Sequence, residues 1–191
     1  MKQPLFISLL LIFCMMACAT TIQPGKPFDD SERRFFDDGI DVVEDVSSLQ
    51  GQFGFEERED MDARCNLADV VGVVEILSVH SNTGADGVEE IRIEVQVKEL
   101  IYGEMTNRQI QLRSNANALG YTLLNRYESA LSGSKILFMR TFHISGESDG
   151  TGHHFHLSPL SPAVLSEVKR LVKKRRNAES GKDKQHAQVK E

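Results

Sequence analysis

Apolar and polar positions follow a strand-like pattern most clearly between residues 68 and 102. Residues 68–80 carry Val and Ile at consecutive positions, which is typical of a strand buried on both faces, and Gly72 within it indicates a bulge or a tight bend. Residues 89–102 alternate between apolar and polar side chains, as expected for a half-buried strand. A short glycine-containing turn at 81–87 separates the two runs, so we expect an antiparallel hairpin. The inward positions of the second strand are Ile91, Ile93, Val95 and Val97.

Three shorter strands are predicted after this hairpin. They cover residues 108–114, 135–144 and 153–160, and the last two are joined by a turn-rich segment at 146–152. Residues 117–131 have helical spacing of their apolar side chains, but Gly120 weakens a helix, so this segment is open to either interpretation. The apolar positions with that spacing are Leu119, Leu123, Tyr127, Ala130 and Leu131.

A helix is predicted to follow the last strand. Ser161 is a suitable N-cap, and Pro162 fits the first helical position, where a missing N–H does no harm. Apolar residues then recur on one face, at Val164, Leu165, Val168, Leu171 and Val172. The basic run 173–176 fits the C-terminal end of this helix, where cations interact favourably with the helix dipole. Binding to a membrane surface is the alternative interpretation of this run.

Five short strands and a terminal helix define the expected fold class, which is mainly β with α. We expect a small five-stranded, OB-like antiparallel barrel followed by a C-terminal amphipathic helix, because closure of a barrel removes exposed strand edges. This domain should span residues 63–176 and fold on its own. Residues 177–191 are polar and are expected to be a disordered tail.

The same strands carry a resemblance to a known family. "ADVVGVVEILSV", the charged strand ending in "VKELIYG", "IQL" and "LSGSKILFMRTF" together are similar to the netrin-like domain, over residues 65–145. This resemblance implies the OB fold that the family shares with tissue inhibitors of metalloproteinases. The family's disulfide cysteines are mostly absent, with Cys65 alone near the start, so inhibitor function is not carried over.

The first 17 residues are interpreted as a signal peptide. Leu5–Met16 is an apolar run broken only by Ser8, and it is shorter than the roughly 20 residues needed to span a bilayer. An uncleaved N-terminal anchor is the alternative. The residues Met15-Met16-Ala17 before Cys18 resemble the lipobox of bacterial lipoproteins, whereas the bulky Phe13 before Cys14 does not fit a cleavage site.

The lipobox resemblance implies cleavage before Cys18, a thioether-linked diacylglycerol on its sulfur and an acylated amine. More than one acyl chain gives stable membrane attachment. Ala19 follows the cysteine, and in lipoproteins of Gram-negative bacteria Asp at that position favours retention at the inner membrane. The expected location is therefore the outer membrane, and the expected partners are the membrane, through the lipid, and a protein of the cell envelope.

Charge is distributed unevenly along the chain. Residues 19–62 carry 13 acidic and 4 basic side chains, whereas the rest of the chain has a small basic excess. The folded part has no basic stripe, which argues against a nucleic-acid partner. We therefore expect 18–62 to be a lipidated, acidic and largely disordered tether that lifts the domain off the headgroups. Its few apolar residues form either an exposed linker or an amphipathic turn that docks; they are Phe35, Phe36, Ile40, Val42, Val43 and Val46.

Candidate chemistry is sparse. Two histidines, His154 and His156, share one face of the last strand, and His143 and His153 lie close to them in the predicted hairpin. Imidazoles at such spacing hold zinc or copper in some proteins, but no further ligand follows at a recognisable spacing, so we expect both to face water as weak metal candidates only. Their partners in the alternation, Phe155 and Leu157, are assigned to the core.

Cys65 is the one cysteine left unmodified after processing. It is expected to be buried rather than catalytic, with an intermolecular disulfide as the alternative. The chain has no nucleophile elbow, zinc-protease motif, phosphate-binding glycine loop or C-x-x-C pair. We therefore expect no enzyme, no catalytic residue and no cofactor, but a lipid-anchored binding or structural module of the envelope. The alternative function is a metal-binding protein that uses the histidine cluster.

Overall fold

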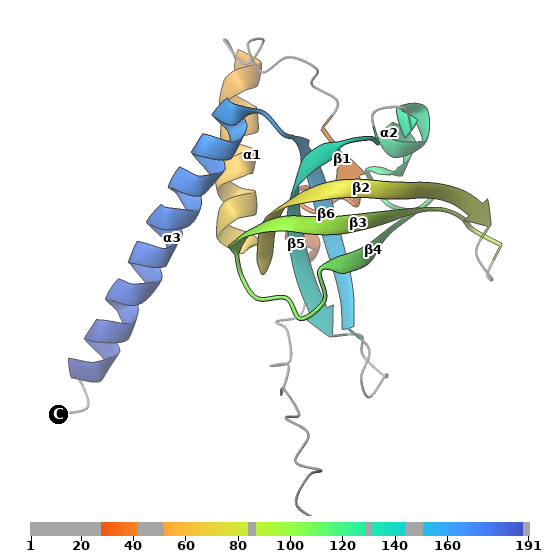
Figure 1. Cartoon of the computed structure of the whole chain (residues 1–191). Helices are drawn as coiled ribbons and strands as arrows, with labels where there is room; N and C mark the ends of the chain where they lie inside the picture. Colours follow the sequence, from red (N-terminus) through yellow and green to blue (C-terminus); the bar gives the residue numbers. More distant parts are fainter. Residues whose placement is uncertain (1–27, 42–51, 84–86, 129–130, 144–150, 189–191) are drawn as a thin grey trace, which may run out of the picture.

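The computed structural model describes residues 28–41, 52–83, 87–128, 131–143 and 151–188 (Figure 1). Side chains are not described at 52–58, 143, 151 and 182–188. The helices are η1, a short 3-10 helix (Asp30–Glu32), α1 (Gln52–Leu67), α2 (Tyr121–Arg126) and α3 (Pro162–Gln188). The strands are β1 (Gly39–Ile40), β2 (Val70–Thr83), β3 (Glu89–Tyr102), β4 (Gln109–Asn115), β5 (Ser134–His143) and β6 (Thr151–Pro159).

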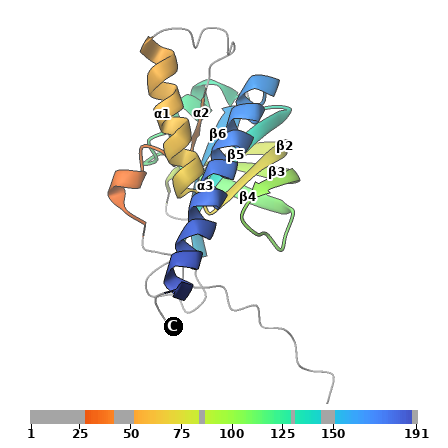
Figure 2. The ribbon, with the colours of Figure 1, turned by 90° about the vertical axis from the view of Figure 1, so that its left-hand side faces the viewer.

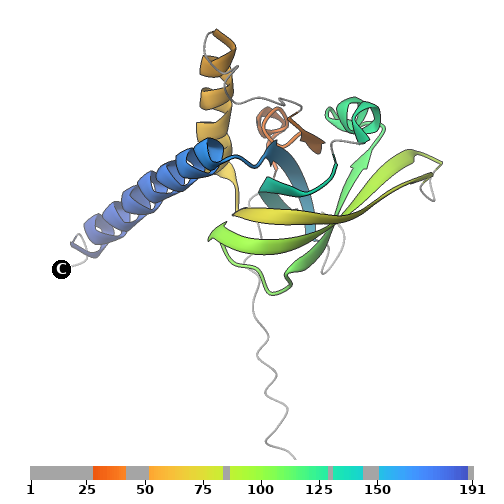
Figure 3. The same cartoon turned by 45° about the horizontal axis from the view of Figure 1, so that its top comes forward.

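All six strands belong to one sheet, in the order β1-β6-β5-β2-β3-β4. Every pair is antiparallel except β1 with β6, where Gly39 and Ile40 lie parallel to His156 and Leu157. The mainly β class with helices is confirmed, but the closed five-stranded antiparallel barrel is wrong. The sheet is a mixed half-barrel, because the second edge of β6 is paired with β1 and not with β4 (Figure 3).

The predicted hairpin of β2 and β3 is confirmed. Along β3 the alternation predicted from the sequence holds, since Ile91, Ile93 and Val95 are fully buried and the polar residues between them are not. The register shifts between Val71 and Gly72, which is the predicted bulge. A side chain at Gly72 would collide with the β3 backbone, since its Cβ would lie 2.8 Å from the Glu99 carbonyl oxygen.

Two apolar clusters fill the two faces of the sheet. The inner cluster occupies the concave face and includes the buried side chains of β3 together with Phe155 and Leu157 of β6. The outer cluster lies between the sheet and helices α1 and α3, which cover the same face (Figure 2). Residues on both faces of β2 and β5 are therefore buried, which explains their continuous apolar runs.

The ambiguous segment 117–131 forms the short helix α2. Leu124 and Leu131 reach the inner cluster, whereas Leu119, Leu123 and Tyr127 are exposed. Helix α2 covers only Tyr121–Arg126, so the i, i+4 spacing of those three residues marks an exposed side of the segment and not the packed face of a longer helix.

Helix α3 begins as predicted. The Ser161 hydroxyl accepts a hydrogen bond from the Val164 N–H at 3.2 Å, and the apolar stripe packs into the outer cluster. The helix runs on to Gln188, so the basic run 173–176 lies in its middle and not at its C-terminal end. Arg175 instead donates to the carbonyls of Cys65 and Ala68, at 3.0 and 2.7 Å. Its charge thereby stabilises the C-terminal end of α1, whose carbonyls need partners.

The acidic segment differs most from the expected tether. Residues 28–41, which we call the strap, lie against the domain, and Phe35, Phe36 and Ile40 within it are buried. Helix α1 also begins at Gln52, eleven residues before the expected start of the domain at 63. The folded unit therefore includes most of the acidic segment that the structure describes.

Candidate functional site

Acidic residues of the strap meet basic residues of the domain at several neighbouring contacts. The strap contributes Glu32, Asp37, Asp38 and Asp41, and the domain contributes Arg64 of α1, Arg140 of β5, and His154 and His156 of β6. We refer to these eight residues as the strap cluster. The strap cluster brings together two histidines, two arginines and four carboxylates. The distances among these side chains decide whether the site can bind a metal or take part in catalysis.

The strap is shaped by short-range signals. The Asp29 carboxylate caps η1 by accepting from the Ser31 N–H at 2.9 Å. Asp38 then takes a left-handed backbone conformation (φ 54°), which is uncommon for a residue with a side chain. Next to it, Gly39 passes so close to Gly120 that a Cβ on Gly120 would lie 2.3 Å from the Gly39 Cα. Together these features turn the chain into β1, alongside β6.

His156 sits at the centre of the strap cluster. Its side chain is 2% exposed, and its Nδ1 lies 2.8 Å from Asp37 Oδ1. Its Nε2 lies 2.9 Å from Asp41 Oδ1 but outside hydrogen-bond geometry, so that contact is an ion pair. Burial opposes the charged ring, yet the neighbouring carboxylates outweigh both burial and Arg64 and raise the pKa of His156. His156 thus lies between two carboxylates that favour the charged form of its ring.

Asp41 balances this charge from the strap. It accepts a hydrogen bond from the Ser158 hydroxyl at 2.7 Å and lies 3.4 Å from Arg64 Nη1. Burial alone would raise the pKa of Asp41, but the charges of His156 and Arg64 hold it well below its usual value. Arg64 also donates from its Nε to the Phe35 carbonyl at 3.1 Å. Helix α1 therefore contacts the strap at both Phe35 and Asp41.

A second histidine–aspartate pair lies beside the first. His154 Nδ1 is 2.7 Å from Asp38 Oδ2, and the other carboxylate oxygen of Asp38 accepts from the Phe155 N–H at 3.0 Å. The His154 ring stacks on Phe142 and lies 4.3 Å from the ring of Phe28, centroid to centroid. The first residue of the strap is thus packed at the turn end of the β5–β6 hairpin.

Arg140 ties η1 to the sheet. Its Nε donates to Glu32 at 2.9 Å, and its Nη1 contacts both carboxylate oxygens of Asp69 at 2.8 and 2.9 Å. Asp69 also accepts from the N–H and the hydroxyl of Thr141. Arg140, Glu32, Asp69 and Thr141 thus satisfy one another within the protein, which is how charges with little exposure are normally tolerated.

Two of the predictions about the histidines are settled by this geometry. The assignment of Phe155 and Leu157 to the core is confirmed. The prediction that His154 and His156 face water is wrong, because the strap covers that face of β6. His153 lies on the other face of β6, with Phe155 and Leu157, and burial lowers its pKa.

The strap cluster is poorly arranged for a metal. Both Nδ1 atoms are already engaged by carboxylates, and no group of three His, Cys, Asp or Glu side chains in the described residues could hold a metal ion. The adjoining cavity, which Asp38, Leu119 and His154 help to line, has a volume of about 30 Å³, the space of roughly one water molecule. Cys18 and the side chain of His143 lie outside the described residues.

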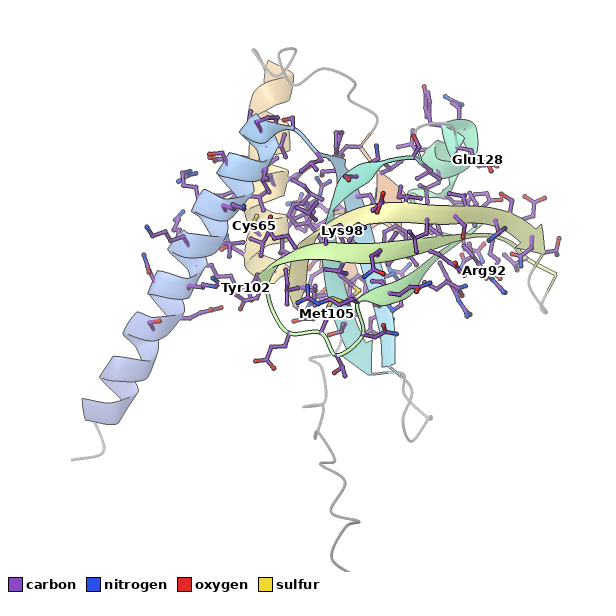
Figure 4. All side chains as sticks on the ribbon, viewed as in Figure 1. Cys65, Arg92, Lys98, Tyr102, Met105 and Glu128 are labelled. Atoms are coloured by element: carbon purple, nitrogen blue, oxygen red, sulfur yellow. The ribbon has the colours of Figure 1, made fainter. Side chains whose placement is uncertain are left out.

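Cys65 is buried, as expected, where the C-terminal end of α1 packs into the outer cluster (Figure 4). Burial raises the pKa of its thiol to about 12, so the reactive thiolate is not populated near neutral pH. A larger hollow of about 290 Å³ lies along β4 and is lined mainly by polar side chains. Its lining residues are Glu94, Asn107, Gln109, Ile110 and Gln111, of which only Glu94 is titratable.

Comparison with protein-family models, with curated proteins and with solved structures found no match for this chain. Among the described helices, none combines the length and the apolar composition needed to cross a membrane. Of the two interpretations of the apolar residues in this segment, the structure supports docking for Phe35, Phe36 and Ile40, which are buried, whereas no sequence pattern predicted the ion pairs of the strap cluster. Adjacent phenylalanines in an acidic segment are a sign of docking, because a solvated linker gains nothing from them.

Proposed function

We propose that this chain is a lipid-anchored protein of the bacterial cell envelope whose domain acts as a non-catalytic binding or structural module. One observation carries the anchor: Met15-Met16-Ala17 precedes Cys18 at the end of a short apolar run. Cleavage there would leave Cys18 at the N-terminus with a diacylglycerol on its sulfur. Ala19 after the cysteine favours the outer membrane of a Gram-negative bacterium.

The geometry of the strap cluster supports a module without chemistry of its own. A general base needs a lone pair free to reach a substrate, and a nucleophile needs an activated thiol or hydroxyl. Here the Nδ1 atoms of His154 and His156 contact aspartates, and the Cys65 thiol is buried with a raised pKa. The two histidines hold the strap on the domain.

The anchor is tested by Cys18→Ser, with Cys14→Ser as the matched control in the same leader. We expect the wild-type protein and Cys14→Ser to fractionate with the outer membrane and to yield an N-terminal peptide with the mass of a diacylglyceryl cysteine. Cys18→Ser should lose both properties. If it is still cleaved before residue 18 and resists a salt wash of the membranes, the proposal is wrong.

Binding by the module is tested by affinity capture from solubilised envelopes, comparing wild-type protein with Cys18→Ser. A partner of the folded domain should be recovered with both proteins once detergent has removed the effect of the lipid. Stoichiometric zinc or copper in the purified protein, removed by changing His154 and His156, would instead favour the metal-binding alternative.

A further inference from the structure

Phe28, the first residue of the described part of the chain, contacts the domain and lies ten positions after Cys18, the proposed lipid site. Ten residues span at most about 33–36 Å when fully extended, because the chain advances by about 3.3–3.6 Å per residue. A free tether from 18 to 62 would reach more than four times as far. Where the chain first attaches to the domain therefore decides how far the domain can move from the membrane.

The strap is attached firmly enough to set that distance. Phe36 and Ile40 are 1% and 2% exposed, and their side chains belong to the outer and inner clusters respectively. Backbone hydrogen bonds add to this: the Asp38 and Asp41 N–H groups donate to the carbonyls of Phe155 and Leu157, both at 2.9 Å. The strap therefore belongs to the fold as an edge element.

The strap is also attached by charge, along its whole length. Glu32 contacts Arg140 near its start, Asp38 contacts His154 in its middle, and Asp41 contacts both His156 and Arg64 at its end. Tension applied at the N-terminal side would have to break these contacts in turn. An upstream lipid would thus pull on several polar contacts in series rather than on a loose chain.

The point of attachment also defines which end of the domain is nearest the lipid. Phe28 packs on Phe142, near the end of β5, and on His154, near the start of β6, so the chain enters at the turn end of this hairpin. The connection from β3 to β4, which contains Met105, lies at the same end, and α2 with Glu128 lies at the opposite end (Figures 1 and 4).

From these observations we infer that the strap moors the domain within about 35 Å of the bilayer, with the turn end of the β5–β6 hairpin nearest the headgroups. This inference rests on the proposed lipid at Cys18. The partner surface is the membrane that carries the anchor, and the length of residues 18–27 sets the upper limit of the distance.

Two matched insertions in the full, lipidated chain test the mooring. One places 30 Gly/Ser residues between Pro27 and Phe28, and the other places the same 30 residues between Ser47 and Ser48. A dye on Thr106→Cys reports energy transfer to labelled lipid in vesicles, and the buried Cys65 does not compete for the dye. The insertion before Phe28 lengthens the segment between the lipid and the strap from ten to forty residues. For a flexible chain this should double the root-mean-square end-to-end distance, from about 16–19 Å to about 32–38 Å.

We expect the insertion before Phe28 to reduce energy transfer clearly and the insertion after Ser47 to leave it unchanged. Equal reductions in the two proteins would show a free tether and overturn the mooring. A dye on Glu128→Cys, on the far end of the domain, should transfer less energy than the dye at Thr106. Equal transfer from the two positions would overturn the proposed orientation.

Failure of the mooring is distinguishable from failure of the anchor. A chain without lipid does not float with vesicles at all, so flotation is measured first and reports on Cys18 alone. Amide hydrogen exchange then provides a readout that needs no insertion. The amides of Asp38 and Asp41 in the vesicle-bound wild-type protein should exchange as slowly as those of β6, and rapid exchange of the strap alone would contradict the mooring.

Discussion

Replacing His156 by alanine should destabilise the domain by about 3 kcal/mol. Removing one member of a buried ion pair typically costs about 3–5 kcal/mol, because the remaining charge is left without a partner. The low end applies here, since the side chains of Asp37 and Asp41 are 19% and 33% exposed and can recruit water. The loss is a large part of the roughly 5–15 kcal/mol that stabilises an ordinary domain.

Urea unfolding followed by circular dichroism measures this effect, and two other histidines provide a scale. His80→Ala on the exposed part of β2 should stay within about 0.5 kcal/mol of wild type, as surface changes usually do. His154→Ala should fall between the two, because its side chain is 25% exposed but stacks on Phe142. His156→Gln keeps a donor for Asp37 and removes only the charge, so it separates the hydrogen bond from the ion pair.

The reasoning is refuted if His156→Ala behaves like His80→Ala. That result would mean that His156 is not enclosed between the strap and β6, and the strap cluster would lose its central contact. Coupling offers a second check, since His156→Ala and Asp41→Asn act on the same ion pair. Their combined destabilisation should be smaller than the sum of the separate values, whereas additive values would indicate independent sites.

Three further predictions concern pH, the thiol and the domain boundary. Because the pKa of His156 is raised by folding, its charged form stabilises the domain. This contribution is fully present below about pH 6.5 and is lost as the pH rises through the folded-state pKa. The urea concentration at the midpoint of unfolding should therefore fall between pH 6 and pH 9. This alkaline loss should be smaller in His156→Gln, and an identical profile in both proteins would contradict the assignment. Cys65 should react with a thiol reagent only on unfolding, because its pKa is about 12 and it is buried; rapid labelling of the native protein at pH 8 would exclude this. A fragment of residues 63–176 should give no cooperative thermal transition, whereas residues 28–181 should, because only the longer fragment keeps the strap and all of α1; equal transitions would show that the strap is dispensable.

Local patterns determined much of the fold. Alternation along β3 named its buried side chains, the glycines at 84 and 87 marked the hairpin, and Ser161-Pro162 marked the start of α3. These signals are local because side chains alternate across a strand and helix ends need caps wherever the element sits in the protein. The N-terminal apolar run and Cys18 are likewise properties of the sequence alone, and their interpretation as a lipid anchor is still a prediction.

Only the tertiary structure decided which segment packs against each face of a strand or helix. The period of β6 placed His154 and His156 opposite Phe155, but periodicity cannot tell whether the opposite face meets water or another segment. Asp37 reaches His156 across 119 residues of sequence, and no local signal encodes that pairing. The same holds for Arg175, which donates to carbonyls at the C-terminal end of α1. It also holds for the acidic strap: its charges alone suggest a solvated segment, but basic residues of the domain face them in the folded structure. A charge count measures how many ionic groups a segment has, whereas only the folded structure shows whether water or an opposite charge satisfies them.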